Sequence, residues 1–557
     1  MSYSTPIADQ KAVLTHIIGM AQLATHERFA SADDDTVDAV LEGAAQFSEG
    51  EFLPLNRSGD EQGATLKDGV VSTPDGFKEA YQAFVEGGWM TLSAPEKWGG
   101  QALPLSLSAA LMEDLNATNL AFALCPMLSF GAIESLLAHG DDALRERYLE
   151  KIVSGEWPAT MNLTEPQAGS DVGALTTKAE PNDDGTWRIS GQKIYITYGE
   201  HDLAENIIHL VLARTPGAPD GTRGISLFLV PKILPDGSRN DLVCAGLEEK
   251  LGIHASPTCV MRFGEKDGAI GWMIGPENSG MRAMFTMMNN ARLNVALQGV
   301  GIAERATQRA VHYALERKQG FREGQSVTIS EHADVRRMLM RMRALTMGAR
   351  ALTYYAFGCL DRAEIGDETM GYRAEVLTPM AKAWATDVGC EVASIGVQVH
   401  GGMGYVEETG AAQHLRDARI APIYEGTNGI QAADLVGRKL GLDGGLAFDG
   451  LVADIRADVR DERLIALSDL VEETASMLRE AGGDHKAAGA YPFLNMCSVL
   501  VAGWLLEKLA LAMDAPARTK AASEFFNSVI VPEAFAQGAA AGMGADILYA
   551  VEAEALA

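Results

Sequence analysis

The chain has 557 residues, enough for about three or four domains, and its 47% hydrophobic and 22% charged content is typical of a soluble globular protein. Its formal net charge of −29 argues against nucleic acid or an anionic membrane surface as the main partner. The 6 cysteines are widely spaced without a CxxC pair, which favours buried reduced thiols over a disulfide framework or a metal site.

The apolar patterns of the chain suggest neither export nor insertion into a membrane. Residues 1–10 lack the basic-then-apolar pattern of a signal peptide. The longest uninterrupted apolar run, around residues 499–506, is too short to cross a bilayer. We therefore expect a cytoplasmic protein without membrane insertion.

Residues 1–156 predict an N-terminal helical domain. Apolar side chains recur there at spacings of three and four, as in Phe77, Tyr81, Phe84 and Val85, which places them on one helical face. The pattern is interrupted at 95–100, where a proline and paired glycines indicate a loop.

Residues 157–280 predict a β domain. The runs 187–189, 193–197, 207–212 and 225–230 are short and rich in β-branched or aromatic residues, as expected of separate strands. Aspartate–glycine pairs between them predict turns.

Helical periodicity returns at residues 281–443, followed by an additional helical module at 444–557. In the first part, a stripe of small residues from Ala296 to Ala310 would let long helices pack closely. A glycine-rich break at 441–445 separates the module, in which Leu464, Leu467 and Val471 mark an amphipathic face. The sequence thus predicts an α+β multidomain fold.

One candidate catalytic residue is Glu425, in the stretch 423–431. The stretch lies between two predicted helices, at 411–419 and 430–440, and glycine follows the carboxylate directly. A carboxylate at such a corner is held by rigid elements, as a general base must be before its pKa matters. A surface glutamate in a helix-capping loop is the alternative interpretation.

Two further stretches could face a cofactor. Residues 161–171 combine glycine, alanine and hydroxyl side chains, which offer backbone N–H groups to an anionic or heteroaromatic ligand. The strand 193–199 alternates aromatic and hydroxyl residues and could lay a ring against a flat cofactor. A plain turn and an ordinary amphipathic strand are the alternatives.

Several other motifs bear on whether the chain has a nucleotide or metal site. The glycines at 299–301 and 401–404 follow helical runs, so neither predicts a Rossmann nicotinamide site. Residues 398–402 could still let the backbone approach a pyrophosphate. Residues 317–319 close a predicted helix that starts near Arg292, where basic groups complement the helix dipole or bind an anionic ligand. The histidines show no paired spacing for a metal.

Taken together, these segments resemble the acyl-CoA dehydrogenase family over residues 75–440. The resemblance is carried by five motifs in family order, at 164–171, 191–197, 317–319, 398–405 and 424–427. It implies an N-terminal helical domain, a middle β-barrel-like domain and a C-terminal four-helix bundle, with FAD bound between them. The additional module resembles that of larger bacterial members, including those that act on 3-methylmercaptopropionyl-CoA in dimethylsulfoniopropionate breakdown.

The resemblance also implies roles for individual residues. Glu425 would be the catalytic base, because Ala291 stands where some members carry a glutamate instead. Two departures from the family are Gly320, inserted before Phe321, and Tyr195, which replaces the usual tryptophan beside the flavin. The implied cofactor-binding residues are Met161, Leu163, Thr164, Gly169, Ser170, Tyr195, Thr197, Arg317, Gln319, Gln398, Gly402, Thr427 and Gly429. The implied substrate-binding residues are Ser170, Asn289, Arg292, Tyr424 and Gly426.

The activity implied is FAD-dependent α,β-dehydrogenation of a short- or medium-chain acyl-CoA, or of 3-methylmercaptopropionyl-CoA, to the trans-2-enoyl-CoA. Hydride would pass to flavin N5, and an electron-transfer flavoprotein would accept the electrons. Because Arg317, Gln319, Gln398 and Gly402 match residues that bind the FAD of a neighbouring subunit, a homodimer or homotetramer is implied. The alternatives are an acyl-CoA oxidase that uses oxygen directly and a catalytically silent flavoprotein scaffold.

Overall fold

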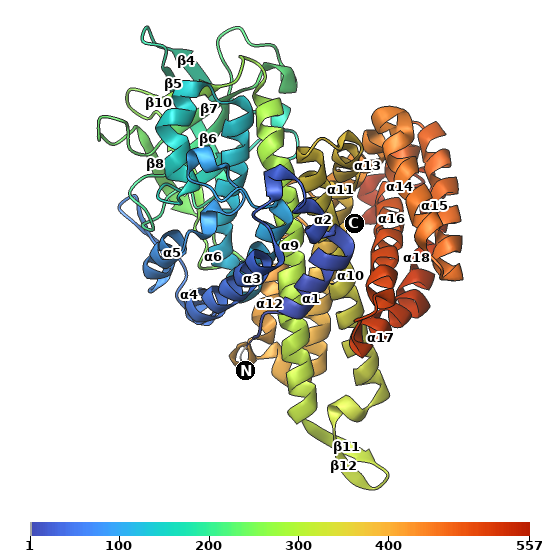
Figure 1. The fold of residues 1–557 in the computed structure, drawn as a ribbon. Helices are drawn as coiled ribbons and strands as arrows, with labels where there is room; N and C mark the ends of the chain where they lie inside the picture. Colours follow the sequence, from blue (N-terminus) through green and yellow to red (C-terminus); the bar gives the residue numbers. More distant parts are fainter. Residues whose placement is uncertain (1–2) are drawn as a thin grey trace. The chain divides into compact units, whose positions relative to one another are not determined.

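The computed structural model describes residues 3–557, which divide into two compact units; Figure 1 labels their elements. Among the described residues, the helical unit comprises residues 3–42, Pro104–Glu113 and Val295–Ala557, and the β unit comprises Gly43–Leu103 and Asp114–Asn294. Helices that begin in one unit and end in the other are α3 (Asp34–Phe47), α6 (Leu105–His139) and α9 (Gly280–Glu316).

The β unit is built on an eight-stranded sheet of order β3-β6-β7-β10-β5-β9-β8, with β4 paired to β5. β3 and β6 pair in parallel, and the remaining pairings in the sheet are antiparallel. Its buried face forms a core around Ile189, Phe228 and Phe263. The strands are β3 (Ala159–Asn162), β4 (Lys178–Pro181), β5 (Trp187–Thr197), β6 (Ile208–Ala213), β7 (Ser226–Pro231), β8 (Leu242–Leu247), β9 (Thr258–Phe263) and β10 (Ala269–Ile274).

The prediction of a middle β domain is confirmed, but the separation of 187–189 from 193–197 is wrong. Both runs belong to the single strand β5. Gly191 and Gln192, which carry no strand signal of their own, still pair with Phe263 and Arg262 of β9. Cross-strand pairing therefore overrides the weak local propensity between the two runs.

Helices of the β unit bury the predicted apolar face of residues 77–85. Phe77 and Phe84 are fully buried and Tyr81 is 3% exposed. The Phe77 ring lies 4.6 Å from that of Phe122, centroid to centroid, and Phe122 lies 4.2 Å from Phe52. The elements are α4 (Leu55–Gln62), β1 (Thr65–Lys67), β2 (Val70–Ser72), α5 (Phe77–Glu86), α7 (Asp142–Leu144) and α8 (Glu150–Val153).

The helical unit is organised around three long helices, α9, α10 (Ala333–Glu364) and α11 (Glu368–His400). Gly299 of α9 lies so close to α11 that a Cβ there would stand 2.1 Å from the Ala385 carbonyl oxygen. Gly299 thus has a packing role, since a residue without a side chain lets long helices approach closely. The other elements before the additional module are α1 (Ile7–Val13), α2 (Met20–Leu23), α12 (Ala411–Ala418) and α13 (Asn428–Gly437).

The predicted helix closing with residues 317–319 needs a correction at both ends. α9 starts at Gly280, before Arg292, and ends at Glu316. Residues 318 and 319 instead open a hairpin of β11 (Lys318–Arg322) and β12 (Gln325–Thr328), with an irregularity between Lys318 and Phe321. The inserted Gly320 has φ +78° at that irregularity, which glycine adopts without strain.

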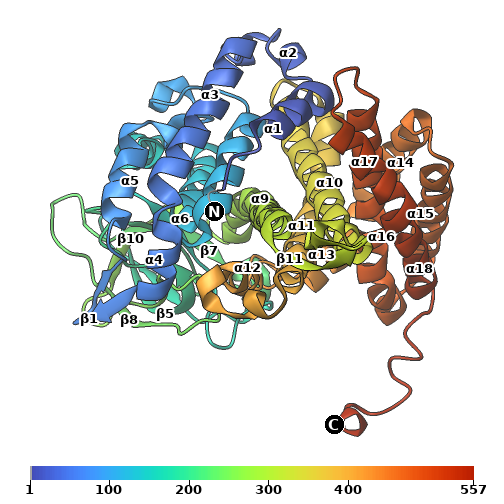
Figure 2. The ribbon, with the colours of Figure 1, turned by 90° about the horizontal axis from the view of Figure 1, so that it is seen from below.

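The additional module packs its helix α16 against α10, α11 and α13 of the same unit, and Figure 2 shows these helices side by side. The predicted apolar face of Leu464, Leu467 and Val471 is fully buried. The helices of the module are α14 (Leu446–Asp458), α15 (Glu462–Glu480), α16 (Gly483–Leu511), α17 (Ala517–Phe525) and α18 (Val531–Ala541).

Two helices, α6 and α16, are long and apolar enough to cross a membrane by length and composition. A search for uninterrupted apolar runs misses these helices, because occasional polar residues break the runs while the mean hydropathy stays high. Their most apolar windows, of mean hydropathy 1.8 and 1.5, are 89% and 78% buried inside the protein. Such burial is typical of core helices in soluble proteins.

The cysteines are free thiols, as the sequence predicts. Cys390 is half-buried and the others are buried. Burial raises the pKa of Cys359 to about 12 and that of Cys390 to about 11, so both thiols stay protonated at neutral pH.

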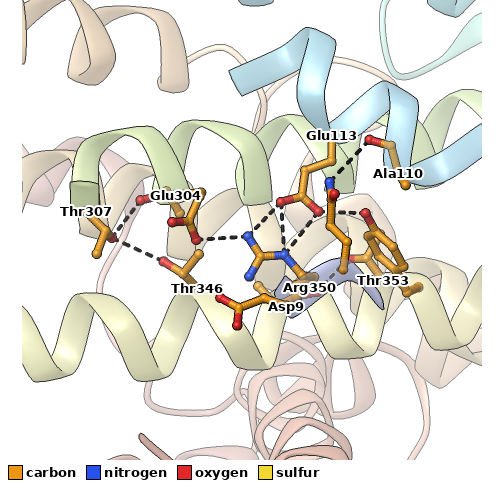
Figure 3. Close-up of polar contacts among 12 residues, drawn as sticks. Asp9, Ala110, Glu113, Glu304, Thr307, Thr346, Arg350 and Thr353 are labelled. Atoms are coloured by element: carbon orange, nitrogen blue, oxygen red, sulfur yellow. Dashed lines mark hydrogen bonds and ion pairs between the residues drawn. The ribbon is translucent and has the colours of Figure 1, made fainter. Parts of the chain in front are cut away.

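The core of the helical unit contains a buried ion cluster centred on Arg350, drawn in Figure 3. Arg350 of α10 donates to Glu113 of α6 (2.7 Å) and to Glu304 of α9 (2.9 Å), and the three side chains are at most 1% exposed. Tyr354 donates to Glu113 (2.8 Å), and Arg343 donates to Glu304 (2.9 Å). The cluster therefore ties α6, α9 and α10 together by paired charges.

Candidate active site

Glu425 lies in the loop between α12 and α13, in an uncommon backbone conformation. Its φ is +54° and that of the following Gly426 is +81°. Glycine adopts this left-handed region without strain, whereas for glutamate it costs about 1–2 kcal/mol. A non-glycine residue keeps such a conformation only where its surroundings enforce it, and this is a common feature of functional sites.

The surroundings hold the backbone of this loop. Gln431 donates to the carbonyl oxygens of Glu425 and Gly426, at 3.3 Å each. The buried Lys382 of α11 donates to the Gly426 carbonyl (2.8 Å) and to the side-chain oxygen of Asn428 (2.9 Å). These contacts fix the backbone on both sides of Glu425, whose side chain is half-buried.

Asn428 anchors the end of the loop to α11. Its side-chain amide donates to the Ala383 carbonyl (3.0 Å), to the Thr386 hydroxyl (3.1 Å) and to Asp387 (2.9 Å). Thr427, directly before it, caps α13 by accepting a hydrogen bond from the Ile430 N–H (3.2 Å). α13 therefore begins at Asn428, three residues after Glu425.

Tyr424 packs on the other side of Glu425. Its hydroxyl donates to the side-chain oxygen of Gln298 on α9. Burial, together with the nearby charge of Glu425, raises the pKa of Tyr424 above its usual range. The phenol therefore stays neutral and adds no second negative charge beside the carboxylate.

In the β unit, a buried ion pair braces the loop that the sequence assigns to a cofactor. Lys193 of β5 donates to Glu165 (2.8 Å) and to the Leu163 carbonyl (3.0 Å). Burial alone would raise the pKa of Glu165, but Lys193, the Thr177 hydroxyl and the Thr176 backbone N–H lower it to about 2. Glu165 is therefore a structural anion, and its pairing fixes the start of the loop.

Tyr195 stands out on β5 because its ring is exposed. It has φ +59° at a β-bulge between Lys193 and Ile196, and 59% of its surface is accessible. The neighbouring Ile194 N–H donates to the Thr164 carbonyl (2.9 Å), which joins the bulge to the loop. A bulge that turns an aromatic ring outward beside a glycine-containing loop suits a flat ligand.

The other predicted cofactor residues of the β unit lie around this bulge. The Met161 side chain is buried on β3, Leu163, Thr164 and Thr197 are half-buried, and Gly169 and Ser170 are exposed. A Cβ at Gly169 would meet nothing within 4 Å, so the loop has room above it.

Arg292 and Asn289 lie three residues apart on α9, in the part that belongs to the β unit. Arg292 donates to the Asn289 side-chain oxygen (3.3 Å), and its guanidinium lies 5.8 Å from the centroid of the Phe285 ring. Arg292 is 5% exposed and Asn289 is exposed, so the pair offers a largely buried positive charge with an accessible amide. Ala291 is buried between them.

The predicted residues for the FAD diphosphate and adenine are all exposed in the helical unit: Arg317 and Gln319 at the hairpin, Gln398 and Gly402 at the end of α11. Exposed rings accompany them, with Tyr405 88% and Phe321 75% accessible. A guanidinium, side-chain amides and open glycine backbone match the donors that a pyrophosphate needs. With the exposed Tyr195 ring and its loop, these residues fit FAD.

The structure thus brings the predicted residues into two sets, one in each unit. Tyr424 to Thr427 form one loop of the helical unit and Gly429 lies in the first turn of α13, whereas the stretch 161–170 and the bulge at 195–197 adjoin each other in the β unit. Sequence reasoning missed the side chains that hold the first set, Lys382, Gln431 and Gln298. A lysine within an apolar helix was the one available signal. Across residues 3–557, no group of three or more His, Cys, Asp or Glu could hold a metal ion.

Three domain families match the chain: acyl-CoA dehydrogenase N-terminal domain at residues 34–156, middle domain at 160–265 and C-terminal domain at 278–440. The chain is 45% identical to the 3-methylmercaptopropionyl-CoA dehydrogenase of Ruegeria pomeroyi, over 96% of both proteins. It is 32% identical to a broad-specificity linear acyl-CoA dehydrogenase of Mycobacterium tuberculosis, over 96% of this chain and 95% of that one. A chain solved in work on the electron transferring flavoprotein of Acidaminococcus fermentans matches with TM-score 0.63 and 27% identity, over 74% of this chain and 99% of that one.

Proposed function

Since the chain belongs to the acyl-CoA dehydrogenase family of FAD-dependent oxidoreductases, we propose that it oxidises an acyl-CoA thioester to the trans-2-enoyl-CoA with Glu425 as the base. The observation that carries this assignment is the conformation of Glu425. Its backbone is held in the left-handed region by neutral and cationic donors to the loop carbonyls, which fixes where the side chain leaves the loop.

Removal of the α-hydrogen is the difficult step for the protein, because a carbon acid next to a thioester is weak. A carboxylate must be held within reach of that hydrogen. Entry of the acyl chain displaces water from Glu425, which strengthens the carboxylate as a base. FAD, when bound, supplies the acceptor for the β-hydrogen, which leaves as hydride.

Two sets of predicted residues would hold FAD. Tyr195 and Thr197 would lie beside the flavin ring, with the backbone of Met161, Leu163, Thr164, Gly169 and Ser170. Arg317, Gln319, Gln398 and Gly402 would bind the diphosphate and adenine, and Thr427 and Gly429 the side nearest the base. Because the exposed Arg317 and Gly402 match residues that reach a neighbouring subunit's cofactor, we propose a homodimer or homotetramer.

The CoA thioester would contact Arg292, Asn289 and Ser170, with Tyr424 and Gly426 beside the reacting carbons. Arg292 is suited to a phosphate or carbonyl oxygen because its charge is largely desolvated. For the acyl group we propose 3-methylmercaptopropionyl or another short or medium chain. The 45% identity to the Ruegeria pomeroyi enzyme supports the sulfur-containing substrate, and the full-length match to a broad-specificity linear enzyme supports the wider class.

We also propose that an electron-transfer flavoprotein in the cytoplasm accepts the electrons, which the match to a chain solved in work on such a flavoprotein supports. The four segments 1–156, 157–280, 281–443 and 444–557 would serve as N-terminal, middle, C-terminal and additional domains. An acyl-CoA oxidase would differ by passing electrons directly to oxygen.

The test is anaerobic titration of the purified FAD-loaded enzyme with a panel of thioesters, including 3-methylmercaptopropionyl-CoA, butyryl-CoA and octanoyl-CoA. We expect rapid bleaching of the flavin absorbance with at least one of them, and formation of one enoyl-CoA per flavin reduced. Turnover with a ferricenium dye should greatly exceed turnover with dissolved oxygen. Faster turnover with oxygen would make the enzyme an oxidase, and no bleaching by any thioester would refute the proposed activity.

A further inference from the structure

One side chain of the additional module reaches toward the loop that carries Glu425. Tyr491 lies on α16, and its hydroxyl donates to the Oδ2 atom of Asp387 on α11. The other oxygen of the same carboxylate, Oδ1, accepts from the Asn428 amide at 2.9 Å. A single carboxylate therefore bridges the additional module and the residue that anchors the base loop.

The contacts of Asn428 fix the orientation of its side-chain amide. Its Nδ2 atom faces three acceptors, on Ala383, Thr386 and Asp387, whereas its Oδ1 atom faces the ammonium group of Lys382. An amide with acceptors on one side and a cation on the other can be oriented in only one way. In that orientation Lys382 reaches the Gly426 carbonyl, next to Glu425.

The bridge lies on the wall of a cavity of about 260 Å³ between α10, α11, α16 and α18. Asp387 and Tyr491 line it, together with Arg341 and Glu533, which pair with each other (2.8 Å). Burial raises the pKa of Asp387, although the hydrogen bonds from Tyr491 and Asn428 lower it. Since the carboxylate is only partly solvated, each donor is costly to lose.

We propose that Tyr491 is a positioning residue for Glu425, acting through Asp387 and Asn428, so that the additional module takes part in setting the active site. The proposal rests on the assignment of Glu425 as the base. Its physical reason is that the left-handed Glu425 persists only while its surroundings enforce it. Without the Tyr491 hydroxyl, Asp387 can rotate and the Asn428 amide loses one of its three acceptors, so the loop is held less firmly.

The primary variant is Tyr491→Phe, which removes the hydroxyl and keeps the ring. We expect the rate of anaerobic flavin bleaching at saturating thioester to fall about tenfold, since small misplacements of a catalytic group have effects of this size or larger. The thioester concentration at half-saturation and the FAD content should stay within about twofold of wild type, because this contact touches neither ligand. Tyr549→Phe, an exposed tyrosine of the same module, is the matched control and should leave all three unchanged.

The second variant, Asp387→Asn, tests the same path, because an asparagine cannot accept from both Tyr491 and Asn428. If Tyr491→Phe lowers the melting temperature, the proposal is judged on the bleaching rate of Asp387→Asn instead. The double variant should be no slower than the slower single variant, since both changes break one path. Unchanged bleaching rates in both folded variants, or multiplied effects in the double variant, would overturn this relay from Tyr491 through Asp387 and Asn428 to Glu425.

The relay and the base assignment fail in different ways. Loss of bleaching in Glu425→Gln with a normal Tyr491→Phe would refute the relay alone. Normal bleaching in Glu425→Gln would refute the base.

Discussion

The helical unit places carboxylates in two contrasting ways. In the Arg350 cluster, Glu113 and Glu304 are buried and each is paired directly with a guanidinium. At the base loop, hydrogen bonds hold the carbonyls of Glu425 and Gly426, and the Glu425 carboxylate stays half-exposed. In the Arg350 cluster the ion pairs themselves hold the helices together. At the base loop, hydrogen bonds hold the backbone and thereby position the carboxylate.

The difference predicts that the two regions answer differently to substitution. Removing a paired charge from the cluster leaves another charge buried without compensation, so stability should suffer most. Replacing the loop carboxylate leaves the hydrogen bonds to the loop carbonyls in place, so turnover should suffer most. The following variants test this division.

The largest effect is expected from Glu425→Gln. Gln keeps the shape of the side chain but cannot take up a proton, and positioned acid–base catalysis contributes roughly 10²–10⁴-fold. Turnover measured with a ferricenium dye should fall by that factor. FAD content should be unchanged, and the free energy of unfolding should change by less than about 0.5 kcal/mol. Turnover close to wild type would show that another residue is the base.

The next largest effect is expected from Arg350→Met. It leaves Glu113 in the core without a guanidinium partner and Glu304 with Arg343 alone. Breaking a buried ion pair from one side costs about 3–5 kcal/mol. Denaturant unfolding followed by circular dichroism would measure this loss. The matched control is Arg456→Met, which breaks a surface pair with Asp469 (2.7 Å) at a side chain 49% exposed and should cost less than about 1 kcal/mol. Equal losses in both variants would contradict the buried cluster's role.

A smaller effect concerns the pH dependence of the same cluster. Burial would raise the pKa of Glu304, but Arg343 and Arg350 outweigh it and lower the value from 4.5 to about 2. The folded protein therefore holds the anion more strongly than the unfolded chain, and this stabilisation is complete above about pH 4.5 and lost as pH falls toward 2. Its size is roughly 3 kcal/mol.

Comparing the unfolding free energy of wild type and Glu304→Gln from pH 6 to pH 2 isolates this contribution. The variant should be the less stable at pH 6, and the difference should shrink on acidification. A difference that stays constant with pH would mean that Glu304 holds no depressed pKa.

Much of the fold could be predicted from local patterns, because buried faces such as that of Leu464, Leu467 and Val471 repeat with the helical period. The continuity of β5 was missed, since it depends on pairing with the distant strand β9. The hairpin after Glu316 pairs residues close in sequence and was missed because its first residues were assigned to the end of a helix. The Arg350 cluster joins helices hundreds of residues apart in sequence, a pairing that no local pattern encodes.

For the site, the motif resemblance pointed to Glu425, but not to its left-handed backbone. That conformation depends on Lys382 and Gln431, of which one lies more than 40 residues away in sequence. The exposure of the Tyr195 ring could not be predicted either, because the bulge that exposes it arises from the register between β5 and β9. Residue identities carry the chemistry, whereas strain and hydrogen-bond direction arise from tertiary contacts.

The smallest predicted effect comes from Gln431→Leu, which tests whether the donors to the loop set its geometry. Leu has a similar volume and Gln431 is fully buried, so packing is largely kept while the two 3.3 Å hydrogen bonds to Glu425 and Gly426 are lost. Each such bond is worth about 1 kcal/mol. Because Lys382 still holds the Gly426 carbonyl, we expect turnover to fall only about threefold to fivefold. The thioester concentration at half-saturation should barely change, since the lost bonds are to the backbone. If stability fell while turnover stayed at the wild-type level, the loop would keep its conformation without this donor, and the contrast with the ion cluster would have to rest on Lys382 and Asn428 alone.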